Sequence, residues 1–333
     1  MGAGPHISVV VPTRNRAHLL PRLVAAVAAQ EDVERSEVVI VDDASTDDTT
    51  AVLAELAAKN PNLVRVLATA APRGAAAARN LGWQRATAPI VAFTDDDCVP
   101  ERSWLARVLD AFTPADVGVV QGVTAFDASE AAGRGPFSQV VSVTAWTGQF
   151  ETSNVAYRRA LLASLGGFDE RFTGDSFGED VDLGWRAIEA GARHAFVPDA
   201  VVVHDVKRGP ALGELLASLR AGVRWRHIGK VLRDHPGYRP HRLHRGPFLA
   251  ATHPPTLLAL GGLLLLAIGP RRGAVRVLAV AAIGPWVRHR IVVEPRPGRW
   301  RQLPLVLPAA LAVDVVETAT VVASGIRYRT LVL

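Results

Sequence analysis

Three consecutive carboxylates, Asp95 to Asp97, are the residues in this chain whose type and spacing point most clearly to chemistry. They directly follow the apolar run 89–93, which predicts a buried strand. A carboxylate is rarely buried without a cation or a strong donor, so packing alone does not explain the triplet. At the end of a strand it would lie at the rim of the sheet, where open α/β folds bind ligands. Asp95 and Asp97 can then face the same side and bind Mg²⁺ or Mn²⁺ together with substrate phosphates, unless the triplet is simply a solvated turn.

Other polar residues follow the ends of the preceding predicted strands. Pro12, Thr13 and Arg14 come where the first strand stops, and they can face a nucleotide, although an ordinary connecting loop explains them as well. Asp43 follows the second strand, where a carboxylate can accept the imide N–H of uracil or thymine, or an amine of guanine. Arg79 lies in a segment that leads into a predicted helix, where it can contact a phosphate or a base.

A second acidic cluster, Glu179 and Asp180, opens a later predicted helix. The helix dipole accounts for an acid such as Glu179 in the first turn, but it leaves Asp180 available as a general base. His204 ends a further strand and can reach a cation from the opposite side, although a single histidine is more often structural.

The elements that must position these residues alternate between strands and helices. Apolar runs at 7–11, 38–41, 63–67 and 90–93 predict strands, and longer Ala- and Leu-rich stretches between them predict helices. Such alternation with short connections predicts an α/β fold with a mostly parallel sheet covered by helices on both faces.

The character of the sequence changes after residue 207. Residues 211–231 predict a basic amphipathic helix, which either lies on an anionic membrane or packs on the domain. Residues 248–270 carry no charged side chain, 274–287 are apolar apart from one arginine, and 303–326 carry Asp314 and Glu317. We therefore expect a catalytic domain at 1–207, an amphipathic helix and linker at 208–247, and an apolar helical, membrane-embedded region at 248–333. The alternative for residues 248–333 is a soluble helical cap.

Composition limits the function classes further. The net charge of +5 and the pI near 9.9 come almost entirely from arginines, many of them among apolar segments, which favours a membrane surface over a nucleic acid. The single cysteine, Cys98, excludes an intrachain disulfide and any zinc site built from several cysteines. The residues before the first strand contain no basic region followed by an apolar segment, so we expect no secretory signal.

Taken together, these segments resemble the family 2 glycosyltransferases, inverting enzymes with the GT-A fold, over about residues 6–207. The resemblance rests on the segments VVPTRN (10–15), VDDASTD (41–47), RNLG (79–82), TDDD (94–97), GGFDERF (166–172) and EDVDL (179–183). It implies a general base at Asp180 with Glu179 beside it, and a divalent cation, Mg²⁺ or Mn²⁺, at Asp97, Asp95 and His204. The residues then expected to bind the nucleotide sugar are Pro12, Thr13, Arg14, Asp43, Arg79, Asp95 and Asp96.

The resemblance implies transfer of one sugar from a nucleoside diphosphate sugar to an acceptor hydroxyl, because the Gln-x-x-Arg-Trp element of processive synthases is absent. The apolar C-terminal region suggests a cell-envelope or lipid-linked glycan as acceptor, and an inner-membrane location with the catalytic domain facing the cytoplasm. Two alternatives stay open. One is a nucleotidyltransferase acting on sugar phosphates, although the loop at 12–15 lacks the expected glycine; the other is a non-catalytic membrane scaffold with the same fold.

Overall fold

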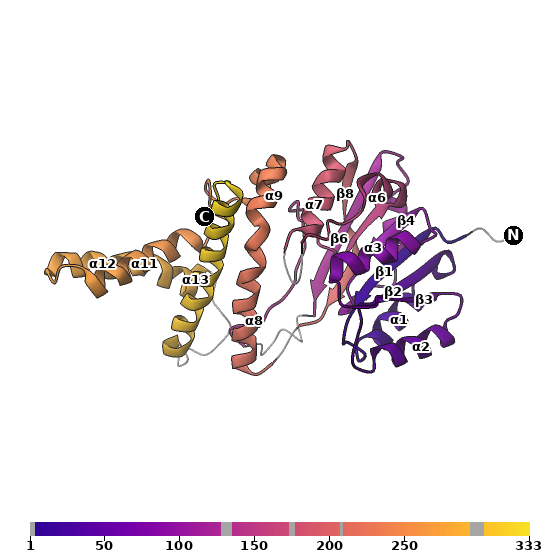
Figure 1. Cartoon of the computed structure of the whole chain (residues 1–333), viewed down its shortest axis with the longest axis horizontal. Helices are drawn as coiled ribbons and strands as arrows, with labels where there is room; N and C mark the ends of the chain where they lie inside the picture. Colours follow the sequence, from indigo (N-terminus) through magenta and orange to yellow (C-terminus); the bar gives the residue numbers. More distant parts are fainter. Residues whose placement is uncertain (1–3, 128–134, 173–176, 207–208, 294–302) are drawn as a thin grey trace. The chain divides into compact units, whose positions relative to one another are not determined.

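The structure is a computed structural model, and it describes residues 4–127, 135–172, 177–206, 209–293 and 303–333 (Figure 1). Contacts divide the chain into two compact units. Unit 1 comprises Met1–Ala128 and Val140–Val206, and unit 2 comprises Ser129–Gln139 and Lys207–Leu333. The three-part division expected from the sequence stays a prediction, and each unit is described by itself.

Unit 1 is built on an eight-stranded mixed sheet with the strand order β3-β2-β1-β4-β7-β6-β8-β5. The first four strands run parallel, as the alternating sequence predicts, and β6 runs parallel to β8. The other pairings, β4–β7, β6–β7 and β5–β8, are antiparallel. The strands are β1 (Ile7–Thr13), β2 (Ser36–Asp42), β3 (Val64–Ala68), β4 (Ile90–Phe93), β5 (Cys98–Pro100), β6 (Val117–Phe126), β7 (Val155–Arg158) and β8 (Arg193–His204).

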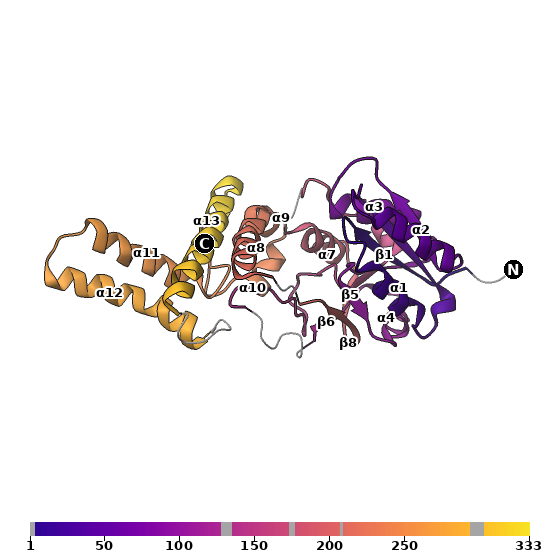
Figure 2. The ribbon, with the colours of Figure 1, turned by 90° about the horizontal axis from the view of Figure 1, so that it is seen from below.

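Helices cover both faces of this sheet because successive side chains of its buried strands point to opposite sides. Val9 and Val11 of β1 join the core that contains residues of α1 and α4, whereas Val10 lies against Gly82 of α3. Helix α3 lies on the opposite side of the sheet from α1 and α4 (Figure 2). Gly82 of α3 allows this approach, since a Cβ there would lie 2.4 Å from Val10 Cγ1. The helices are α1 (Leu20–Ala28), α2 (Thr49–Lys59), α3 (Ala75–Arg85), α4 (Trp104–Ala111), α6 (Arg159–Leu165) and α7 (Glu179–Glu189), with a short 3₁₀ turn η1 (Val33–Arg35).

Unit 2 is helical. Its helices are α8 (Ala211–Val223), α9 (Ile228–Asp234), α10 (Arg239–Arg242), α11 (His253–Ile268), α12 (Gly273–Arg288) and α13 (Leu303–Tyr328). Three short turns, η2 (Arg224–His227), η3 (Pro236–Tyr238) and η4 (His289–Val293), complete it. Helices α11 and α12 lie side by side as a hairpin, and α8 and α9 run along α13 (Figures 1 and 2).

The single helix predicted over 211–231 is wrong in one respect, because η2 interrupts it. The Gly229 amide donates to Ser324 Oγ of α13 at 2.9 Å, so it does not continue the helical ladder. The apolar stripe of α8 is divided as well. Leu215 and Leu219 pack on the core of unit 2, whereas Leu212 is exposed.

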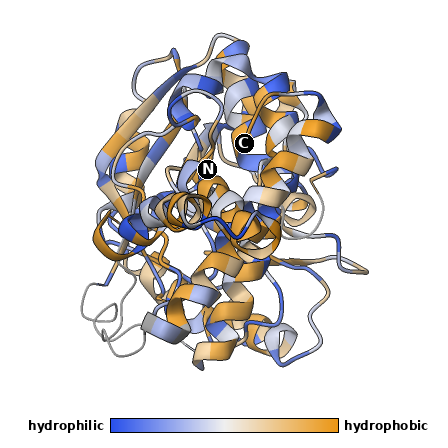
Figure 3. Cartoon of the chain, turned by 90° about the vertical axis from the view of Figure 1, so that its left-hand side faces the viewer, coloured by the Kyte–Doolittle hydropathy of each residue, from blue (hydrophilic) through white to orange (hydrophobic). Residues whose placement is uncertain are grey.

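Helices α11, α12 and α13 correspond to the three apolar segments. Several apolar side chains of α11 and α12 are exposed, among them Leu258, Leu264, Val277 and Leu278. The ribbon coloured by hydropathy has much orange on the side drawn in Figure 3. Within α13, Val306–Tyr328 is long and apolar enough to cross a membrane, and α11 is a shorter apolar helix. Asp314, one of the two acids in the third apolar segment, is buried and accepts from Arg290 Nε at 2.9 Å and from Trp286 Nε1 at 2.8 Å. Its charge is therefore compensated inside the unit.

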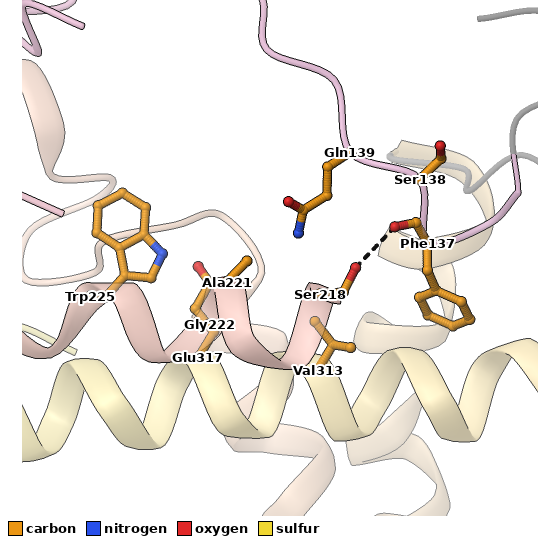
Figure 4. Close-up of a pocket in the computed structure, with 9 residues that line it drawn as sticks. All are labelled: Phe137, Ser138, Gln139, Ser218, Ala221, Gly222, Trp225, Val313 and Glu317. Carbon is orange, nitrogen blue, oxygen red and sulfur yellow. Dashed lines mark hydrogen bonds between the residues drawn. The ribbon is translucent and has the colours of Figure 1, made fainter. Parts of the chain in front are cut away.

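Unit 2 also contains a cavity of about 210 Å³ beside α8 and α13 (Figure 4). Ser218 Oγ donates to the Phe137 carbonyl at 3.0 Å at one end, and Trp225 stands at the other. The remaining lining residues are Ser138, Gln139, Ala221, Gly222, Val313 and Glu317.

Candidate active site

The candidate site lies at the edge of the sheet where β1, β2 and β4 end. Because these strands are parallel and adjacent, with Thr13 opposite Asp42 and Val10 opposite Phe93, their following residues meet at one rim. The polar segments that the sequence placed after three separate strands are thus neighbours in the fold.

The aspartate triplet is divided among three different partners. Asp95 Oδ1 accepts from Arg79 Nη2 at 2.8 Å. Asp96 accepts from Thr13 Oγ1 at 2.7 Å and from Arg16 Nη1 at 2.9 Å. Asp97 Oδ2 accepts from the same Arg16 nitrogen at 2.8 Å. Arg79 therefore holds Asp95, whereas Arg16 holds both Asp96 and Asp97 through one nitrogen.

Asp96 is buried, and burial raises the pKa of its carboxyl to about 6, an effect that Arg16 partly opposes. Its hydrogen bond to Thr13 ties the loop after β1 to the triplet. Thr13 and Asp96 are thus both buried and bonded to each other, and their predicted contact with the nucleotide sugar remains a proposal.

Asp97 and His204 form the part of the site best suited to a cation. His204 Nε2 lies 3.2 Å from Asp97 Oδ1, and His204 Nδ1 lies 2.8 Å from the Asp205 carbonyl. An Nδ1–H that donates to that carbonyl leaves Nε2 as an acceptor, so two acceptors face each other. A divalent cation between them satisfies both, and a carbonyl behind a ligating imidazole is a common supporting contact at metal sites. These residues therefore fit Mg²⁺ or Mn²⁺.

The triplet is connected to the second acidic cluster by Arg79. Arg79 is 5% exposed. Besides its bond to Asp95, its guanidinium lies 3.5 Å, through Nη1, from Glu179 Oε1 at the start of α7. The structure thus gives Arg79 two carboxylate partners inside the protein. A contact with a phosphate or base, as predicted, has to coexist with this bridge.

Asp180 follows Glu179 in the first turn of α7 and is half-buried. Burial, together with the negative charges of Glu179 and Glu151, raises the pKa of its carboxyl well above the usual range. Its Oδ1 accepts from the Val181 amide at 2.8 Å. A carboxylate with a raised pKa is a stronger base, which suits proton abstraction from a hydroxyl.

Asp43 lies farther along the rim and anchors the loop before α3. It accepts from the amides of Arg73 at 2.9 Å and Gly74 at 2.8 Å, and from Thr69 Oγ1 at 2.9 Å. Pro12 is half-buried and Arg14 is exposed at the end of β1. The proposed contacts of these three residues with a nucleotide stay predictions.

Three residues near the site were missed by reasoning from the sequence. Arg16, which holds both Asp96 and Asp97, directly follows the predicted loop at 12–15 but was given no role, so its position could have been recognised. Glu151 and Tyr157 come from outside every motif. Burial and the charge of Asp180 both raise the pKa of Tyr157, which places this phenol near the proposed base.

Known proteins resemble this chain in sequence and in fold. The family model described as glycosyl transferase family 2 matches residues 8–163. The pre-mycofactocin glycosyltransferase of Mycobacterium tuberculosis is 33% identical over 216 residues, covering 60% of this chain and 42% of that protein. The validoxylamine A glucosyltransferase of Streptomyces hygroscopicus is 33% identical over 217 residues, covering 55% and 51%. The chain thus spans about half the length of these relatives.

Solved structures share the fold. The mannosyltransferase PcManGT from Pyrobaculum calidifontis, in complex with GDP-Man and Mn²⁺, has a TM-score of 0.57 at 24% identity, over 98% of this chain and 88% of that one. S. aureus TarS 1-349, in complex with UDP-GlcNAc, has a TM-score of 0.53 at 18% identity, over 97% and 92%. The family match over residues 8–163, these relatives and the GT-A fold agree, so this part of the chain is similar to the glycosyltransferases of family 2.

Proposed function

We propose that this chain is a metal-dependent, inverting glycosyltransferase that moves a sugar from a nucleoside diphosphate sugar to an acceptor hydroxyl. The observation that carries the proposal is the pairing of Asp97 and His204 on the rim that Arg79 connects to the start of α7. The similar structures solved with GDP-Man and Mn²⁺ and with UDP-GlcNAc support a nucleotide-sugar donor.

The proposed roles follow from the contacts. Asp97 and His204 hold Mg²⁺ or Mn²⁺, which would neutralise the charge of the departing diphosphate. Asp95 faces the ribose and the diphosphate, while Asp43 receives a donor group of the base. Asp180 accepts the proton of the acceptor hydroxyl as its oxygen attacks the anomeric carbon. Attack from the face opposite the leaving group inverts that centre.

Binding measurements on the purified full chain test the donor and the cation. We expect one class of nucleoside diphosphate sugar to raise the melting temperature with Mn²⁺ present and to fail to do so in EDTA. Asp97→Asn should abolish this shift, whereas Asp116→Asn, which alters an exposed ion pair with Arg193 in the same unit, should keep it. Nucleotide-sugar binding that is unchanged in EDTA and in Asp97→Asn would refute the metal assignment. Binding without any sugar transfer to supplied acceptors would favour the non-catalytic alternative.

The proposal extends to the membrane. Helices α11 and α12 contain 16 residues each, about 24 Å, which is shorter than a hydrocarbon core of about 30 Å, whereas α13 is long enough to cross. We expect unit 2 to attach the enzyme to the inner membrane, with unit 1 on the cytoplasmic side, and a cell-envelope or lipid-linked glycan to be the acceptor. Release of the protein by carbonate or high salt would indicate peripheral attachment, and dependence on detergent would indicate insertion. Solubility of the intact chain without detergent would contradict both.

A further inference from the structure

Cys98, the single cysteine of the chain, lies beside the two proposed metal ligands. It is the cross-strand partner of His204 in the antiparallel β5–β8 pair, so both side chains leave the sheet on the same face. Asp97 Oδ1 or Oδ2, Cys98 Sγ and a ring nitrogen of His204 all lie within 4.8 Å of one another. All three residues are buried, so the cluster is shielded from bulk water.

We propose that Asp97, Cys98 and His204 together bind a soft divalent cation, Zn²⁺ foremost, with the Cys98 thiolate as the third ligand. Zn²⁺ accepts thiolate, imidazole and carboxylate in a tetrahedral arrangement, with bonds of about 2.3, 2.0–2.1 and 2.0–2.2 Å. The edge of such a tetrahedron between nitrogen and oxygen is about 3.3 Å, close to the 3.2 Å between His204 Nε2 and Asp97 Oδ1. Binding replaces the S–H bond of Cys98 by an S–Zn bond and releases the proton to solvent.

The Cys98 sulfur changes which cation the site proposed for catalysis prefers. Mg²⁺ prefers oxygen ligands in an octahedron and gains nothing from a thiol, whereas Zn²⁺ gains a strong bond. The inference rests on the proposed function, because that function already places a cation at Asp97 and His204. It adds that Zn²⁺ binds at the same place and that the Cys98 thiolate, which Mg²⁺ does not use, is a further ligand. Zn²⁺ should therefore displace Mn²⁺ or Mg²⁺.

The competing explanation is that Cys98 is only a small core residue, since it packs within the hydrophobic core of unit 1. A direct spectroscopic probe separates the two explanations. In the metal-free full chain in detergent, added Co²⁺ should produce a thiolate-to-cobalt charge-transfer absorption in the near ultraviolet, and Zn²⁺ should remove it. Because the chain has one cysteine, such a band can come from Cys98 alone. Co²⁺ that gives no such band would overturn the proposal, and this result needs no variant.

Variants add a second measurement. Cys98→Ser should remove the band and weaken Zn²⁺ binding by at least ~10-fold. Asp97→Asn should weaken both Co²⁺ and Zn²⁺ binding, because it removes a ligand common to every cation. Zn²⁺ affinity unchanged in Cys98→Ser would contradict the assignment. The wild-type response to nucleotide sugar with Mn²⁺ is measured separately. A cobalt band without a response to nucleotide sugar would refute only the proposed function. A response to nucleotide sugar without a cobalt band would refute only the Zn²⁺ site.

Discussion

Replacing Asp180 by Asn tests the proposed base with a change of one functional group and almost no change of shape. The amide cannot accept the proton of an acceptor hydroxyl. A positioned base contributes ~10²–10⁴-fold to the rate, so we expect kcat to fall by that factor, which corresponds to about 2.7–5.5 kcal/mol in the activation free energy. The KM for the donor should change little, because Asp180 is assigned to the acceptor and not to the nucleotide.

The same substitution should not destabilise the protein. The pKa of Asp180 is raised in the folded state by burial and by the charges of Glu179 and Glu151. A carboxyl with a folded-state pKa above its unfolded-state value disfavours folding at any pH above the unfolded-state value. Asn removes this cost, so the melting temperature at neutral pH should be equal to or higher than that of the wild type. The difference should shrink as the pH falls.

Steady-state kinetics with saturating donor, together with thermal unfolding at pH 5 and pH 8, measure both quantities. Asp116→Asn serves as the control, because its exposed pair with Arg193 contributes little to stability and lies in the same unit. The reasoning fails if Asp180→Asn keeps more than about a tenth of the wild-type kcat. A severe loss in Glu179→Gln with a mild one in Asp180→Asn would instead identify the neighbouring acid as the base.

The remaining predictions concern pH, packing and charge. In the wild type, kcat/KM should fall as the pH drops through the raised pKa of Asp180, and Glu151→Gln should move this acidic limb to lower pH, because it removes a negative charge that raises that pKa. An acidic limb that does not move would show that Glu151 does not act on the base. Gly82→Ala should lower the free energy of unfolding by about 1–3 kcal/mol in denaturant titrations, since the new Cβ would overlap a core valine of β1; an unchanged value would mean that α3 shifts freely. Arg290→Met should cost about 3–5 kcal/mol and lower the melting temperature in detergent, because it leaves the buried Asp314 carboxylate without its cationic partner and with Trp286 as donor; a stable variant would show that the carboxyl is neutral there.

The sequence by itself determined the class of the fold and the segments that carry the site. Apolar runs of strand length, alternating with helical stretches, predicted the four parallel strands β1 to β4. The apolar run before Asp95 predicted a strand, and β4 (Ile90–Phe93) is that strand. These signals are local, because the side-chain period and the residues that end an element are read within a few positions. For the same reason the motifs after each strand could be recognised one by one.

Which of these residues touch one another was decided only by the tertiary structure. The triplet reads as three equivalent acids, yet Asp95 accepts from Arg79, Asp96 accepts from Thr13 and Asp97 lies beside His204. Arg16 holds the last two of these carboxylates together. The antiparallel pairing of β5 with β8 brings Cys98 opposite His204, across more than 100 residues of chain. Strand pairing over such a separation is fixed by the packing of the whole sheet and not by any local pattern. The charge of Glu151 on Asp180 likewise exists only once the chain has folded.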